Sequence, residues 1–102
     1  MARYEKPHKP DKKLLLALGR RLRSLRERQG LTIEQLSAAA DINFKYLQRC
    51  ETGRSNPSVS ILFAIASGLA VRPEKIIAGI KKSNSPFSPA LHPRSSSAKI
   101  RP

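Results

Sequence analysis

The sequence predicts an all-α domain of five helices between two basic tails. Apolar residues recur at spacings of three and four in successive segments, which is the period of an α-helix. Four of these segments follow a Ser, Thr, Asn or Asp, the preferred helix N-caps, and the fifth begins with a proline. A chain of 102 residues has room for one ordinary core, so the helices should form one domain.

We expect this domain to span residues 11–82. Residues 1–10 hold two prolines, several charges and few apolar side chains, which predicts a disordered basic arm. Residues 83–102 are rich in proline and serine and contain no acidic residue. They should form a disordered basic tail.

The first helix should begin after the N-cap Asp11 and end at about Gln29, before Gly30. Its apolar stripe consists of Leu15, Leu18, Leu22 and Leu25. Its other faces carry Arg20, Arg21, Arg23, Arg26 and Arg28. A solvated helix surface would account for these arginines without any ligand.

The second and third helices should be joined by a tight turn. Thr32 is the expected N-cap of the second helix, and Asn43 that of the third. Asp41, between them, tolerates the left-handed conformation that a tight turn requires. The third helix should cover about residues 44–52 and stop at Gly53. Two short helices joined in this way match the helix-turn-helix motif.

The third helix has two chemically different sides. At about 100° per residue, Leu47 and Cys50 fall on one side, which should face the core. The opposite side carries Phe44, Lys45, Gln48 and Arg49. Lys45 and Arg49 can donate to guanine, Gln48 can pair with adenine, and a phenyl ring can pack on a thymine methyl. This face is therefore the candidate for DNA base contacts.

The fourth helix should run from its cap Ser58 to about Leu69. The fifth should begin at Pro73, and Gly79 and Lys81-Lys82 should end it. The fourth is apolar on nearly all sides. Its surplus apolar residues either complete a small core or meet a second copy of the chain, and the sequence supports both equally. The dimer hypothesis assigns the contact surface to Phe63, Ile76, Ile77 and Ile80.

The charge balance points to a polyanionic partner. Twenty Lys and Arg against seven acidic residues give a net charge of +13. The excess is concentrated in residues 1–30 and 81–102, whereas residues 31–80 hold five basic and four acidic residues. We expect the first helix and the tails to supply non-specific attraction.

Several segments occur in an order typical of one family. They are Leu22-Arg23-Ser24-Leu25-Arg26, Gly30-Leu31-Thr32, Leu36-Ser37, Ala40-Asp41-Ile42-Asn43, Glu51-Thr52-Gly53 and Asn56-Pro57-Ser58, followed by Leu62, Ala66, Leu69 and Val71. With them, residues 18–78 resemble the phage-repressor-like helix-turn-helix family, also called Xre or Cro/C1. A lone helix-turn-helix pattern is a weak signal, but matching flanks on both sides make it specific.

The resemblance implies roles for individual residues. It places Phe44, Lys45 and Arg49 at base-contacting positions, and it implies a structural ion pair between Arg26 and Glu51. The candidate phosphate contacts are Arg21, Thr32, Asn43, Tyr46, Arg54 and Asn56.

The chain departs from the family pattern at two informative positions. Ile33 stands where the family usually has a glutamine that contacts phosphate, so that contact should be missing. Ala70 stands where glycine is common, which predicts an irregular end to the fourth helix.

The sequence gives no support for catalysis or for a bound cofactor or metal. Only His8 and His92 are present, and Cys50 is the single cysteine, so a zinc site lacks ligands. No phosphate-binding glycine loop occurs, and a lone cysteine on a core face is usually a small hydrophobe. No apolar run approaches a membrane span or a signal peptide. We expect a cytoplasmic, nucleoid-associated protein without a small-molecule ligand.

The favoured hypothesis is a transcriptional regulator that binds specific double-stranded DNA as a homodimer. Two alternatives remain open from the sequence. One is an antitoxin or adaptor that uses the same fold to bind protein. The other is a weakly specific, basic nucleic-acid-binding protein, architectural or RNA-binding, driven by its tails.

Overall fold

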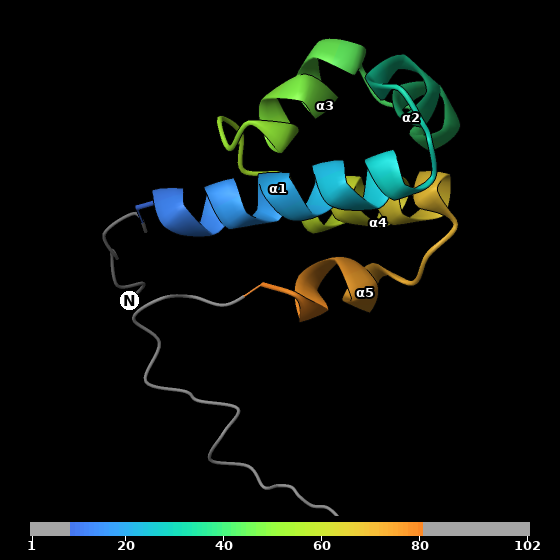
Figure 1. Cartoon of the computed structure of the whole chain (residues 1–102). Coiled ribbons are helices and arrows are strands. Elements are labelled where there is room, and N and C mark those ends of the chain that lie inside the picture. Colours follow the sequence, from blue (N-terminus) through green and yellow to red (C-terminus); the bar gives the residue numbers. More distant parts are fainter. Residues whose placement is uncertain (1–8, 81–102) are drawn as a thin grey trace, which may run out of the picture.

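The computed structural model describes residues 9–80, and they contain five α-helices and no strand (Figure 1). The helices are α1 (Lys12–Arg28), α2 (Ile33–Ala40), α3 (Phe44–Glu51), α4 (Val59–Leu69) and α5 (Pro73–Ala78). The predicted all-α class is confirmed, and the helix boundaries lie within two residues of their predicted places, except that α5 ends at Ala78 instead of near Lys81-Lys82. The predicted disorder of residues 83–102, and of all but the last two residues of 1–10, falls outside the described residues.

The predicted N-caps start the first four helices. Asp11 and Thr32 accept hydrogen bonds from the backbone N–H groups of Leu14 and Gln35, both at 3.0 Å. The Gln35 side chain returns a bond to the Thr32 N–H, which completes a capping box. The remaining two caps are Asn43 and Ser58. Each cap satisfies a donor that the helix itself leaves without a partner.

The helix α1 runs through the middle of the domain, with α2 and α3 on one side of it and α5 on the other (Figure 1). The helix α4 lies behind α1 in this view and packs against α2 and α5. All five helices contribute to one core, which consists of Leu18, Leu22, Leu25, Leu36, Leu47, Cys50, Ile65, Ala66, Leu69 and Ile76. This arrangement leaves the outer side of α3 free of any other helix.

Two glycines allow helices to approach closely. A Cβ atom at Gly19 in α1 would lie 2.4 Å from the carbonyl oxygen of Glu51, at the end of α3. A Cβ atom at Gly68 in α4 would lie 3.0 Å from the backbone nitrogen of Ala40 in α2. Gly19 therefore sets the separation of α1 and α3, and Gly68 that of α4 and α2.

Within residues 9–80, two non-glycine residues adopt the left-handed conformation. Asp41 has φ 57° and ψ 46°, as predicted for the turn between α2 and α3. Ala70 has φ 56° and ψ 40° at the end of α4, where its N–H bonds to the carbonyl of Ser67. Its Cβ makes this conformation costly, whereas a glycine would adopt it freely.

We therefore expect Ala70→Gly to stabilise the domain by about 1 kcal/mol, because glycine relieves the strain at this helix end. Urea unfolding followed by circular dichroism measures the effect. The matched control is Ala38→Gly, the same substitution at an exposed position inside α2, which should destabilise by about 1 kcal/mol. Destabilisation by both variants would show that Ala70 is not strained.

Candidate nucleic-acid interface

The outer face of α3 carries the four predicted base-contacting side chains. Lys45, Gln48 and Arg49 are exposed, and Phe44 is 37% exposed. On the opposite side, Leu47 and Cys50 are fully buried. Burial raises the pKa of the Cys50 thiol, so it stays protonated and acts as a small apolar side chain. The core thus fixes the rotation of α3 and presents its polar face to solvent.

The predicted ion pair holds the end of α3 against α1. Arg26 Nε and Nη2 donate to the two Glu51 carboxylate oxygens at 2.7 and 2.9 Å, and Arg26 Nη1 donates to the Leu31 carbonyl at 2.7 Å. The two side chains are 9% and 3% exposed. These hydrogen bonds raise the pKa of Arg26 further above its ordinary value. This buried, bidentate ion pair joins α1 to α3, and the bond to Leu31 ties both to the segment that precedes α2.

Arg49 is oriented by two neighbours that the sequence did not reveal in this role. Its guanidinium carbon lies 5.5 Å from the centroid of the Tyr46 ring, within the range of a cation–π contact. Its Nε donates to the Ser55 hydroxyl at 3.3 Å. Tyr46 is half-buried against the core, and desolvation raises its pKa. Tyr46 therefore supports the Arg49 side chain. The sequence had suggested Tyr46 only as a candidate phosphate contact.

Four other candidate phosphate contacts lie at exposed positions around α3. Thr32 and Asn43 occupy the N-caps of α2 and α3, and Arg54 and Asn56 lie in the connection from α3 to α4. The side-chain oxygen of Asn43 accepts the capping hydrogen bond, so its amide NH2 group is not used by the cap and can donate to another group. Ile33 packs against the core, so it takes no part in this polar rim.

Arg21, also expected to contact phosphate, is instead used inside the domain. Its Nη2 and Nε donate to the Lys75 carbonyl of α5 at 2.8 and 3.3 Å. Its guanidinium also lies against Gly79. Because α5 lies across α1 from α3 (Figure 1), Arg21 points away from the candidate interface. This geometry supports a structural role for Arg21 between α1 and α5.

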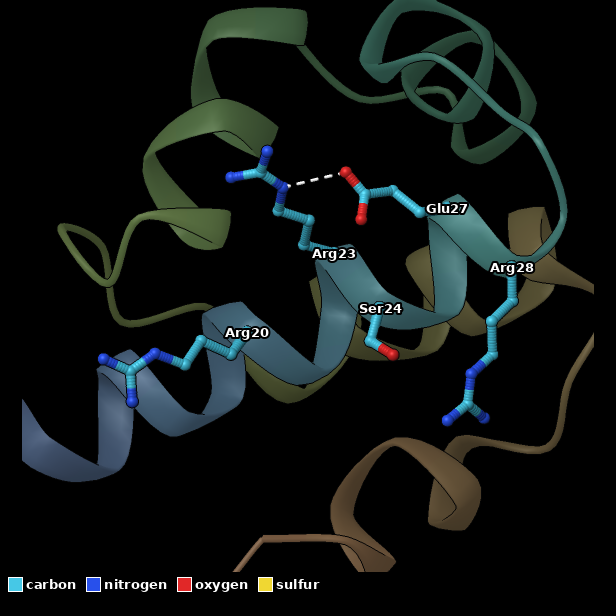
Figure 2. Close-up of a pocket in the computed structure, with 5 residues that line it drawn as sticks. All are labelled: Arg20, Arg23, Ser24, Glu27 and Arg28. Carbon is cyan, nitrogen blue, oxygen red and sulfur yellow. Dashed lines mark hydrogen bonds and ion pairs between the residues drawn. The ribbon is translucent and has the colours of Figure 1, made fainter.

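The outer face of α1 forms a shallow hollow lined by Arg20, Arg23, Ser24, Glu27 and Arg28 (Figure 2). Arg23 points toward α3 and donates to Glu27 at 3.0 Å, in a pair that is 63% and 54% exposed. Arg20 points along α1, and Arg28 points toward α5 (Figure 2). The guanidinium groups of Arg20, Arg23 and Arg28 point in different directions, so they do not converge on one bound anion. We interpret this face as a solvated surface.

Residues 9–80 contain no cluster of three or more His, Cys, Asp or Glu side chains able to hold a metal ion. No helix within that range has the length and apolar character needed to cross a membrane.

Comparison with known proteins identifies this arrangement. A family model described as a helix-turn-helix domain matches residues 17–76, more than half of the chain. The chain belongs to this helix-turn-helix family. The match contains the whole of α2, the turn and α3. The recognition made from the sequence is therefore confirmed.

Two curated relatives are similar in sequence to this chain. The transcriptional regulator DdrOP3 of Deinococcus deserti is 35% identical over 66 residues, which cover 65% of this chain and 51% of the relative. The immunity repressor protein of Bacillus phage phi105 is 34% identical over 62 residues, covering 61% of this chain and 43% of the relative. The chain spans about half the length of these relatives.

Solved structures of similar proteins confirm the phage-repressor-like fold. The restriction-modification controller protein C.AhdI of Aeromonas hydrophila is 31% identical, with a TM-score of 0.60, over 61% of this chain and 94% of that chain. The clp gene regulator ClgR of C. glutamicum is 30% identical, with a TM-score of 0.61, over 69% of this chain and 88% of that chain.

Proposed function

We propose that this protein is a transcriptional regulator that binds specific sequences of double-stranded DNA in the cytoplasm. The observation that best supports this proposal is the outer face of α3. It presents Lys45, Gln48 and Arg49 to solvent, while the opposite side of the helix is buried in the core. A helix with such a face fits the major groove, where its side chains reach base edges. The family membership and the names of the relatives support this proposal.

Phosphate contacts around α3 would set its register on the duplex. Thr32 and Asn43 lie at helix N-termini, where backbone N–H groups favour phosphate, and Arg54 and Asn56 lie beyond the other end of α3. DNA backbone contacts at both ends would hold Arg49, already oriented by Ser55, against one base pair.

Replacing Arg49 with alanine should cost about 1–3 kcal/mol on the preferred site and relax the preference at one base position, because a guanidinium contact to guanine is lost. Competition binding against every single-base variant of the site measures this. The matched control is Arg72→Ala, which removes the same charge from an exposed position before α5. An equal loss on all sequences would make Arg49 a phosphate contact.

We further propose that the protein binds as a homodimer through α4 and α5. Phe63 and Val59 are 57% and 69% exposed on α4, and Ile77 is 55% exposed on α5. The α5 part of this surface lies across α1 from α3, so pairing there leaves α3 free (Figure 1). A two-fold dimer requires an inverted repeat in the DNA.

The proposed dimer surface differs from the predicted one at α5. Ile76 is fully buried in the core and cannot meet a second copy, and Ile80 is half-buried against the same core. Ile77, the next residue in the same short helix, is instead 55% exposed and remains in the proposed surface.

Phe63→Asp should shift a dimer to monomer, because it places a charge in an apolar contact. Sedimentation velocity of the full chain, with and without a selected duplex, measures the stoichiometry. Ser24→Asp, on the outer face of α1 and away from the proposed dimer surface, controls for added charge. A wild-type protein that binds one asymmetric half-site as a monomer would contradict the dimer.

A further inference from the structure

A second cationic hollow lies between the first turns of α1 and the connection from α3 to α4. Its polar lining consists of Lys12, Thr52, Arg54 and Asn56, with Leu15 and Leu16 in its apolar wall. The neighbouring carboxylate of Asp11 accepts a hydrogen bond from the Leu14 N–H, within the helix start itself. The hollow therefore combines two cations and an amide from segments far apart in the sequence.

The two sides of this hollow are in close contact at Gly53. Gly53 has φ +76°, and a Cβ atom there would lie 2.8 Å from Leu16 Cδ2. The connection thus rests directly on α1, and Figure 1 shows it above the first turns of that helix. Lys12 and Arg54 are consequently carried by two segments that pack against each other, and both residues line the same hollow.

This surface is continuous with the proposed base-contacting face of α3. The Arg54 N–H donates to the Arg49 carbonyl at 2.8 Å, and the Arg49 side chain reaches Ser55 in the same connection. The α3–α4 connection thus joins Arg49 to the hollow, because Arg54 and Asn56 in that connection line the hollow with Lys12. DNA carries a phosphate every few ångströms along each strand, so the polymer can extend over this distance.

We propose that the hollow binds the DNA backbone outside the base pairs that α3 contacts, with Lys12 and Arg54 neutralising phosphates there. The inference rests on the proposed DNA binding and extends its footprint. Lys12 lies in the first turn of α1, outside residues 17–76 that the family model matches. It is a positioning contact, equal on all sequences, and gives no base preference.

The test compares Lys12→Gln with Lys13→Gln in the full chain. Both residues are exposed at the start of α1 and carry the same charge, but only Lys12 lines the hollow. Lys12→Gln should weaken binding severalfold on preferred and unrelated duplexes alike, and should lower the slope of log affinity against log salt by about 0.9. Phosphate ethylation interference should lose one flanking position. Lys13→Gln should change none of these.

Equal effects of the two variants would overturn the proposal, because they would reflect overall charge rather than a site. No effect of either would overturn it as well. The test of this hollow does not depend on base recognition by α3. If the wild-type protein shows no preferred sequence, the salt slopes measured on an unrelated duplex still show whether Lys12→Gln differs from Lys13→Gln. Arg54→Gln provides a second variant and should lower the slope like Lys12→Gln.

Discussion

Glu51→Ala is expected to destabilise the domain by about 3–5 kcal/mol, because it leaves the buried guanidinium of Arg26 without its counter-charge. Arg26 would keep only its bond to the Leu31 carbonyl. Small domains are stable by about 5–15 kcal/mol in total, so this variant should be partly unfolded near physiological temperature. Urea unfolding followed by circular dichroism at 25 °C measures the loss.

The matched control is Glu27→Ala, which removes the exposed partner of Arg23 in the same helix as Arg26. Its cost should stay below about 0.5 kcal/mol, since solvent-exposed pairs on a helix contribute little. A double variant, Arg26→Met with Glu51→Leu, should recover most of the stability lost by Glu51→Ala. Equal costs for Glu51→Ala and Glu27→Ala would show that the Arg26–Glu51 pair does not join α1 to α3.

The second large effect is expected at Gly19. A Cβ atom there would overlap the backbone carbonyls of Glu51 and Cys50, at 2.4 and 2.7 Å. Backbone atoms cannot rotate away, so Gly19→Ala must separate α1 from α3. Overpacking of this kind typically costs about 1–3 kcal/mol, and we expect a net loss of about 2–3 kcal/mol even after the gain of alanine in helix propensity.

Gly79→Ala is the control for this substitution. The nearest neighbour of its Cβ atom would be the guanidinium of Arg21, at 3.1 Å, the far end of a flexible side chain. The cost should remain below about 0.5 kcal/mol. The Gly19→Ala variant should also bind DNA less tightly, because α3 would move relative to the rest of the domain. A stable Gly19→Ala variant with wild-type affinity would contradict this account of the α1–α3 contact.

Local chemistry made most of the fold predictable. Helix caps such as Asp11 and Ser58 act within three residues of their own position, so the sequence displays them directly. The polar and apolar sides of α3 follow from the helical period alone. The Arg26–Glu51 pair joins residues 25 apart, and only the family resemblance suggested it.

The errors concern contacts that depend on tertiary packing. Arg21 resembles the other arginines of α1 in sequence, and only the docking of α5 gives it an acceptor at Lys75. Ile76 and Ile77 are chemically identical, and the period of so short a helix cannot say which one is buried. The support of Arg49 by Ser55 depends on the path of the α3–α4 connection, which no periodicity describes.

The most direct measurement is selection of bound duplexes from a random DNA pool by the full chain, repeated with Arg49→Ala. We predict enrichment of an inverted repeat whose half-sites are about 34–36 Å apart, one turn of the double helix. The Arg49→Ala pool should lose its preference at one symmetric pair of positions. A wild-type pool that stays random, although the protein binds it in a salt-dependent way, would contradict sequence-specific recognition by α3.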